Sequence, residues 1–264
     1  MFRHILIAHD LSREADVALQ RAAQLARQHG ARLTLLHVLD HPDLRDATAA
    51  HLQRRLAACG SPDAQVLLAS GLPYEVIAQR LKDQEADLLV LGAHHKGRPE
   101  LFSGTTLERV ARCSQVPVLL AVTEPAEPYR QGLVALDFSL AACTALQLSH
   151  RLLPDDAELF ALHIHEVAPV RAAKAQEDLA LQSSLFEQLV ADERTRLAAG
   201  SRLQHGIRQG ERLDCLAAAV DELRPQLLAL GQHNRSVLSE ALLGGLAQQL
   251  LRQPPCDVLI SRGA

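Results

Sequence analysis

The chain repeats itself at the scale of a domain. An apolar run ending in Asp-x-Ser occurs near the start of each half, at 5–12 and again at 132–139. A second apolar run ends at Gly92 in the first half and at Gly231 in the second. Internal similarity at this scale is the signature of a repeated structural unit. The 264 residues are long enough for two copies that each bury a core, so we expect two domains.

The segment between the copies marks their boundary. Residues 123–128 carry two prolines and two acids without hydrophobic periodicity, which is typical of a linker. We therefore predict one domain over residues 1–125 and a second over 129–264. The second copy is longer between its second and third strands. Residues 174–197 there have the spacing of one long helix, which we interpret as a covering helix, with a partner-binding helix as the alternative.

Short apolar runs alternate with amphipathic stretches in both halves. Strands are expected at 5–9, 32–39, 64–69, 87–92 and 116–122, and again at 133–136, 159–163, 202–205, 227–231 and 258–261. Strands separated by helices predict an α/β fold in which each half forms a doubly wound, Rossmann-like parallel sheet of five strands. The expected order in each sheet is 3-2-1-4-5, with helices on both faces.

Composition excludes several classes of function. The net charge is −4, aromatic residues make up 3% and no basic cluster occurs, so we expect no nucleic-acid partner. No apolar run approaches the length of a membrane span, and the apolar residues near the start are expected to form a strand and not a targeting segment. The five cysteines are odd in number and scattered, which favours a reducing compartment. We expect a cytoplasmic protein without a membrane partner.

The polar signatures of both halves lie where strands end. Ligands of open parallel sheets bind beyond the carboxyl ends of the strands. Asp10 and Gly92 follow strands one and four of the first half, and Asp137 and Gly231 follow those of the second. In the expected order these strands are neighbours, so each pair faces one crevice. The alternative is that each Asp-x-Ser segment only caps the helix that follows it.

The loop after the fourth strand supplies phosphate-binding chemistry in the first half. Gly104 precedes Thr105 and Thr106 at the start of an expected helix, which offers backbone N–H groups, hydroxyls and a favourable dipole to a phosphate. The second half has Gly244 and Gly245 at this place, and no hydroxyl beside them.

Together these motifs resemble the universal stress proteins. Nucleotide-binding members of that family carry an Asp after strand one, an adenine-contacting aliphatic residue at the end of strand two, and G-x-x-G, nine residues, then G-[ST] after strand four. The resemblance covers essentially the whole chain as a tandem pair. For the first half it implies an ATP site around Asp10, Val38, Gly92, His94, His95, Gly104, Thr105 and Thr106. For the second half it implies one around Asp137, Ile164, Gly231, Asn234, Gly244 and Gly245.

Each copy departs from the family motif in its own way. The first has His95 in place of the second glycine and eight residues, not nine, before Gly104. The second keeps the spacing of nine, but Asn234 replaces the glycine and Gly245 replaces the Ser or Thr. Asn tolerates positive φ better than most residues. The first copy therefore keeps the phosphate hydroxyl and the second keeps the loop length.

The resemblance implies a non-enzymatic stress-response protein that binds ATP and signals through conformation or through a protein partner that the sequence does not identify. The alternative is a nucleotide-independent interaction scaffold with degenerate sites. No general base for ATP hydrolysis is identifiable beyond Asp10, and the P-loop and dinucleotide fingerprints are missing. The pairs His94–His95 and His163–His165 lack the further ligands of a zinc site, so we expect no metal.

The fifth strands predict how the two copies associate. Residues 116–122 and 257–261 are apolar and lie at a sheet edge in the expected order, where unpaired backbone groups would be exposed. Single-domain members of the family commonly dimerise, so the resemblance points the same way. We therefore expect an intramolecular pseudo-dimer through these strands, and the sequence leaves a further homodimer open.

Overall fold

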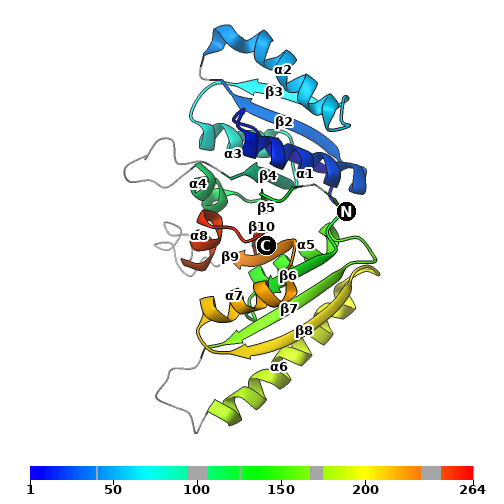
Figure 1. Ribbon diagram of the computed structural model, residues 1–264, viewed down its shortest axis with the longest axis vertical. Coiled ribbons are helices and arrows are strands. Elements are labelled where there is room, and N and C mark those ends of the chain that lie inside the picture. The colour runs from blue at the N-terminus through cyan, green and yellow to red at the C-terminus, as the bar shows by residue number, and fades with distance from the viewer. Residues whose placement is uncertain (40, 94–105, 125–126, 167–174, 233–244, 264) are drawn as a thin grey trace. The chain divides into compact units, whose positions relative to one another are not determined.

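The computed structural model describes residues 1–264 except 40, 94–105, 125–126, 167–174, 233–244 and 264 (Figure 1). Its internal contacts divide the chain into two compact units. The first consists of Met1–Pro128 and Asn234–Val258, and the second of Tyr129–His233 and Leu259–Ala264. The first unit thus includes residues from the end of the second repeat. The predicted boundaries at 125 and 129 remain a prediction.

Strands and helices alternate through the first repeat. In chain order they are β1 (His4–Ala8), α1 (Arg13–His29), β2 (Arg32–Val38), a 3-10 turn (Pro42–Leu44), α2 (Arg45–Ala58), β3 (Gln65–Ala69), α3 (Pro73–Asp83), β4 (Leu88–Gly92), α4 (Thr106–Cys113) and β5 (Val118–Ala121). The strand order is β3-β2-β1-β4-β5 with every neighbouring pair parallel, which confirms the predicted order of this repeat.

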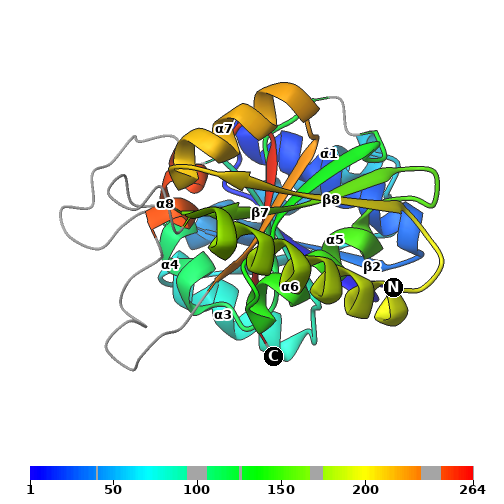
Figure 2. The same cartoon turned by 90° about the horizontal axis from the view of Figure 1, so that it is seen from below.

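The second repeat follows the same sequence of elements. They are β6 (Gln131–Ala135), α5 (Leu140–Leu152), β7 (Glu158–His165), α6 (Ala175–Arg196), β8 (Arg202–Gln209), α7 (Arg212–Leu223), β9 (Leu227–Gln232), α8 (Gly245–Arg252) and β10 (Asp257–Arg262). The second unit has the order β9-β6-β7-β8 and the residues of β10 from Leu259 onward. Figure 2 shows α7 on one side of β7 and β8, and α5 and α6 on the other.

Local sequence signals explain where α1 begins and ends. Ser12 is the N-cap, with its hydroxyl oxygen accepting a hydrogen bond from the backbone N–H of Ala15 at 3.1 Å. Gly30 ends the helix with a left-handed backbone at φ 61°, as its position in the sequence indicates. The helix packs against β1 and β4, and Ile5, Leu6 and Ile7 of β1 are fully buried. Burial of consecutive residues is typical of a parallel strand covered on both faces.

The expected long helix of the second repeat is present as α6. One of its faces buries Phe186, Val190 and Glu193 completely, so this face covers the unit as predicted. Leu181 and Leu185 lie on the helix with 60% and 50% of their surface exposed. The alternative interpretation, a helix that binds a partner, remains a prediction supported by these two side chains.

Candidate functional site

A cavity of about 190 Å³ lies at the carboxyl ends of β1, β2 and β4 in the first repeat. The register aligns Ala8 of β1 with Leu91 of β4 and with Leu36 of β2, so the three strands end side by side. Helices α3 and α4 add further walls. The lining includes Asp10, His37, Val38, Ile77, Gly92 and Thr106. The cavity therefore occupies the place where open parallel sheets bind ligands.

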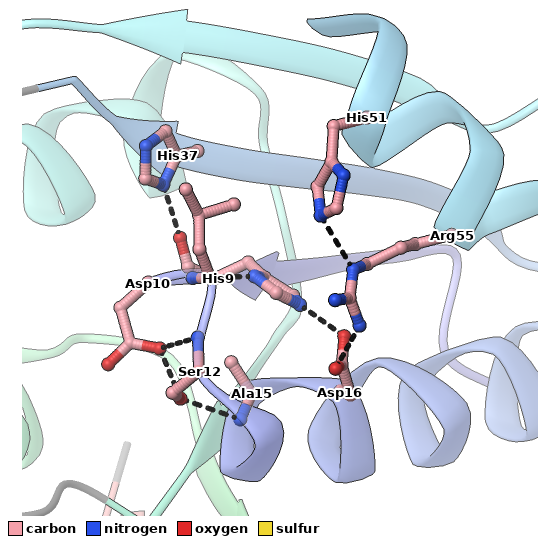
Figure 3. A network of polar contacts seen from close by, with 9 residues as sticks. His9, Asp10, Ser12, Ala15, Asp16, His37, His51 and Arg55 are labelled. Carbon is pink, nitrogen blue, oxygen red and sulfur yellow. Dashed lines mark hydrogen bonds and ion pairs between the residues drawn. The ribbon is translucent and has the colours of Figure 1, made fainter. Parts of the chain in front are cut away.

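The turn between β1 and α1 presents Asp10 to this cavity (Figure 3). Its Oδ1 accepts hydrogen bonds from the backbone N–H of Ser12 at 3.0 Å and from the Ser12 hydroxyl. Between these two residues, Leu11 has a φ of 68°, which is uncommon for a residue with a branched side chain. Such a conformation costs on the order of 1 kcal/mol and persists only where its surroundings hold it. The predicted cap is confirmed for Ser12, and Asp10 holds that cap in place.

The imidazole of His9 links this turn to α1 through two hydrogen bonds. Its Nδ1 accepts the backbone N–H of Leu11 at 3.0 Å, and its Nε2 donates to Oδ1 of Asp16 at 3.1 Å. The other carboxylate oxygen of Asp16 is paired with Arg55 of α2, whose Nε donates to Nε2 of His51 at 2.9 Å (Figure 3). The His9 side chain is fully buried, and this burial lowers its pKa.

His37 fixes the same turn from the neighbouring strand. Its Nδ1 donates to the backbone oxygen of His9 at 2.7 Å, while the backbone N–H of His9 donates to the oxygen of Leu36 at 2.9 Å. The ring of His37 also lines the cavity beside Val38. His9 is thus fixed by hydrogen bonds of its backbone N–H, its backbone oxygen and its side chain.

Gly92 lies in the cavity wall and also at a close approach of two backbones. A Cβ at this position would lie 2.5 Å from the backbone oxygen of Glu14 and 2.9 Å from the nitrogen of Ala15. The first turn of α1 therefore packs directly on the end of β4. Gly231 makes the same approach in the second repeat, where a Cβ would lie 2.3 Å from the backbone nitrogen of Ala142. Packing alone requires glycine at both places.

The turn of the second repeat repeats that of the first in detail. Phe138 has a φ of 67°, and Asp137 accepts the Ser139 hydroxyl at 2.6 Å. Ser139 caps α5 by accepting the N–H of Ala142 at 3.1 Å. His163 donates from Nδ1 to the backbone oxygen of Leu136 at 2.9 Å, as His37 does to that of His9.

Two residues of the turn differ between the repeats, at the places of His9 and Leu11. Leu136 occupies the place of His9, so the second turn has no imidazole acceptor there. Its positive-φ residue is instead packed among aromatic rings. The centroid of Phe138 lies 4.7 Å from that of His163 and 6.1 Å from that of Phe186 of α6. The longer α6 of this repeat thus supplies through packing what a hydrogen bond supplies in the first.

The structure brings together four of the residues predicted for the first site, namely Asp10, Val38, Gly92 and Thr106. The other four, His94, His95, Gly104 and Thr105, lie outside the described residues. In the second repeat, Asp137 follows β6, Ile164 lies in β7 and Gly231 in β9. Gly245 begins α8, which belongs to the first unit, whereas Asn234 and Gly244 also lie outside the described residues.

The sequence did not predict that His9 and His37, or residues of α3, line this cavity. His9, His37, Pro73 and Ile77 all line it. The equivalence of His37 and His163 between the repeats was a visible signal for one of them. The roles of His9 and Ile77 depend on contacts between distant elements and leave no local motif. Among the residues that the structure describes, no group of three His, Cys, Asp or Glu side chains is placed to hold a metal ion.

Comparison with known proteins decides the family. The model of the universal stress protein family matches twice, over residues 1–121 and 128–262. The chain belongs to the universal stress protein family. It is a tandem pair of such domains, and the family acts in the stress response. Within the described residues, no helix has the length and apolar character needed to span a membrane.

Individual relatives agree with this assignment. The chain is 34% identical over 135 residues to a universal stress protein of Thermus aquaticus, covering 46% of this chain and 98% of the relative. It is 30% identical over 119 residues to universal stress protein A of Escherichia coli K12, covering 39% and 83%. A universal stress protein structure from Archaeoglobus fulgidus matches with a TM-score of 0.71 at 19% identity, covering 99% and 96%, and shows the shared fold.

Proposed function

We propose that this protein is a non-enzymatic stress-response protein that binds an adenine nucleotide, ATP, in the cavity of its first repeat and signals through conformation or a protein partner. The observation that carries the proposal is the cavity itself. It lies at the carboxyl ends of β1, β2 and β4 and is lined by Asp10, Val38, Gly92 and Thr106. Asp10, Val38 and Gly92 are the described positions at which the sequence matches the motif of the nucleotide-binding members of the family, and Thr106 directly follows the motif's Thr105.

The chemistry of the lining supports a nucleotide. Apolar groups of Val38 and Ile77 provide surface for a base, and the carboxylate of Asp10 is placed to accept hydrogen bonds from ribose hydroxyls. Thr106 begins α4, so its hydroxyl and the first N–H groups of the helix lie where a phosphate is favoured. Of the titratable groups that the described residues bring to this cavity, His9 uses both ring nitrogens and His37 uses its Nδ1 in hydrogen bonds of the turn, so we infer binding without hydrolysis. The five free cysteines favour action in the reducing cytoplasm.

The second candidate function is a nucleotide-independent scaffold. Two observations favour it in the second repeat. The Gly244–Gly245 sequence has no hydroxyl for a phosphate, and α6 exposes Leu181 and Leu185, which a partner could cover. In this case α6, and not the cavity of the first repeat, would be the functional surface.

Titration calorimetry with ATP tests the proposal. We expect binding to the wild-type protein and a loss of about ten- to a hundredfold in affinity for Asp10→Ala, because hydrogen bonds to a charged group are worth about 1.5–3 kcal/mol. Asp137→Ala is the matched control, since its carboxylate makes the same hydrogen bond to a Ser hydroxyl in the second repeat. Unchanged affinity in Asp10→Ala, with clear binding in the wild type and a loss in Asp137→Ala, would move the site to that repeat. Absence of ATP binding in the wild-type protein would favour the scaffold.

A further inference from the structure

The first repeat has a titratable group inside the turn that carries Asp10. Nδ1 of His9 accepts the backbone N–H of Leu11, and the bond length is 3.0 Å. An acceptor nitrogen must carry a lone pair, so the ring is neutral and its proton resides on Nε2, which donates to Asp16. A second proton can bind only at Nδ1. Its uptake would replace the acceptor with a donor that faces the Leu11 N–H.

The backbone of Leu11 makes this hydrogen bond important for the turn. Its φ of 68° is unfavourable for a leucine and is maintained only by the contacts around it. Leu11 lies between Asp10 and Ser12, which both line the cavity. Loss of the bond from its N–H would release the turn at the residue that positions the carboxylate.

The groups around His9 set when it takes up a proton. Asp16 of α1 accepts its Nε2 proton and Asp10 lies in the same turn, and both carboxylates favour the charged ring. Arg55 of α2, which is ion-paired with Asp16, disfavours the charged ring and lowers the pKa of His9. His37 of β2 donates to the His9 backbone oxygen, and His51 is in contact with Arg55. Burial is the largest influence, and the pKa of His9 is lowered overall.

Other histidines at the two turns respond differently to protonation. His37 and His163 each use Nδ1 as a donor to a backbone oxygen, and a protonated ring keeps that bond. In the second repeat Leu136 stands at the place of His9, and Phe138 is held by packing against His163 and Phe186. The second turn therefore serves as an internal control, because it has no imidazole that accepts a hydrogen bond from its positive-φ residue.

We propose that His9 is a positioning residue whose neutral imidazole holds the Leu11 turn, so that proton uptake at Nδ1 releases the turn and displaces Asp10 in the cavity of the first repeat. This makes the first cavity sensitive to acid and leaves the turn of the second repeat unaffected. The effect on ligand affinity rests on the proposed function, whereas the effect on the turn does not.

Nuclear magnetic resonance tests the turn directly. We expect the Leu11 amide to shift between pH 7.5 and 5.0 with the same midpoint as the His9 ring, while the Phe138 amide does not follow that midpoint. His9→Asn keeps an acceptor two residues before the Leu11 N–H but takes up no proton, so its Leu11 amide should not titrate. His9→Leu introduces the residue of the second repeat and should shift this amide at every pH. Should His9→Leu fail to fold, His9→Asn still decides the proposal.

Two results would overturn the proposal. One is a Leu11 amide that does not follow the titration of His9, and the other is the same amide titration in His9→Asn. For affinity, we expect the ratio of the ATP association constant of the wild type to that of His9→Asn to fall as the pH is lowered from 7.5 through the His9 midpoint, by about tenfold once the ring is protonated. Protonation of ATP itself affects both proteins and cancels in this ratio. A constant ratio overturns the link to ligand binding, and absence of ATP binding at any pH overturns the proposed function while the amide titration still tests the turn.

Discussion

Gly92 contributes to the protein at two levels. It lies in the cavity wall, where sequence motifs place a nucleotide contact, and it also lets the first turn of α1 approach β4 without a side chain between them. The second requirement holds whether or not a ligand binds. A glycine that a motif identifies as functional is therefore under a packing constraint as well, and a loss of binding in its variants must be compared with a loss of stability.

We predict that Gly92→Ala lowers the free energy of unfolding by about 1–3 kcal/mol, because the added Cβ would lie 2.5 Å from the backbone oxygen of Glu14 and the two elements must move apart. Urea denaturation followed by circular dichroism measures the change. Gly245→Ala is the control, since a Cβ there meets no atom within 4 Å. Equal stabilities for the wild type and Gly92→Ala would contradict the close approach.

Replacement of either N-cap serine by alanine should lower the free energy of unfolding by a similar amount. Ser12→Ala and Ser139→Ala should each destabilise the protein by about 1 kcal/mol, because each hydroxyl accepts a helix N–H at 3.1 Å. The geometry of the two caps is the same, so the two losses measured by urea denaturation should agree closely. A large cost at one serine with none at the other would show that the two turns are not equivalent.

At the scale of elements, a buried ion pair joins α1 to the start of β10 within the first unit. Nε of Arg21 lies 2.9 Å from Oδ2 of Asp257, and both side chains are almost completely buried. Oδ1 of Asp257 accepts the backbone N–H groups of Val122 and Thr123 at 2.8 and 2.9 Å. One carboxylate thus satisfies a helix side chain and the backbone that follows β5.

Asp257→Ala should cost about 3–5 kcal/mol, because it leaves the Arg21 guanidinium buried without its carboxylate. The shift of the urea midpoint measures this cost. Asp156→Ala is the matched control: its carboxylate pairs with Arg130 on the surface, where both side chains are about two thirds exposed, and its loss should cost less than about 1 kcal/mol. Similar costs for the two variants would show that the Arg21 pair is better solvated than its burial indicates.

The alternation of elements was predictable from the sequence, but the contacts between distant elements were not. Apolar runs and helix caps predicted the strands and helices, including the long α6, because periodicity and capping act over a few neighbouring residues. The strand order of the first repeat was expected from the common arrangement of doubly wound sheets. The ion pair of Asp16 with Arg55 and the bond of Arg21 to Asp257 join residues far apart in the chain. No local sequence motif near any of these four residues indicates which residue it contacts.

The candidate site likewise contains residues that the sequence could predict and residues that it could not. Asp10, Val38 and Gly92 could be placed at the ligand-binding edge of the sheet because they end or follow strands that are neighbours in the expected doubly wound order. The role of His9 could not be predicted, since it depends on a turn geometry that the sequence Asp-x-Ser does not specify. At the scale of the whole molecule, the pairing of the fifth strands in an intramolecular pseudo-dimer remains a prediction, as does a further homodimer.

The histidines give the molecule as a whole a dependence on pH. Burial is the largest cause of a lowered pKa at five of them, His4, His9, His29, His150 and His163. The ordinary value, 6.5, applies to the unfolded chain. The unfolded state therefore binds more protons than the folded state once the pH falls toward 6.5 and below. Stability rises with pH wherever this is so, and it is lost as the pH falls.

We therefore predict that the free energy of unfolding is highest near pH 7 to 8 and falls steadily between about pH 6.5 and 5. Urea denaturation at half-unit steps of pH measures the curve. The slope over this window should be smaller in His9→Asn, because one proton-binding group of the unfolded chain is removed together with its buried counterpart. Arg55→Gln gives a second, independent test. It removes a positive charge that lowers the pKa of His9, so the difference between the folded and unfolded values narrows and the slope should also decrease. A flat curve in the wild-type protein would mean that these rings take up protons without cost in the folded state, and it would contradict the buried, neutral imidazole on which the Leu11 turn depends.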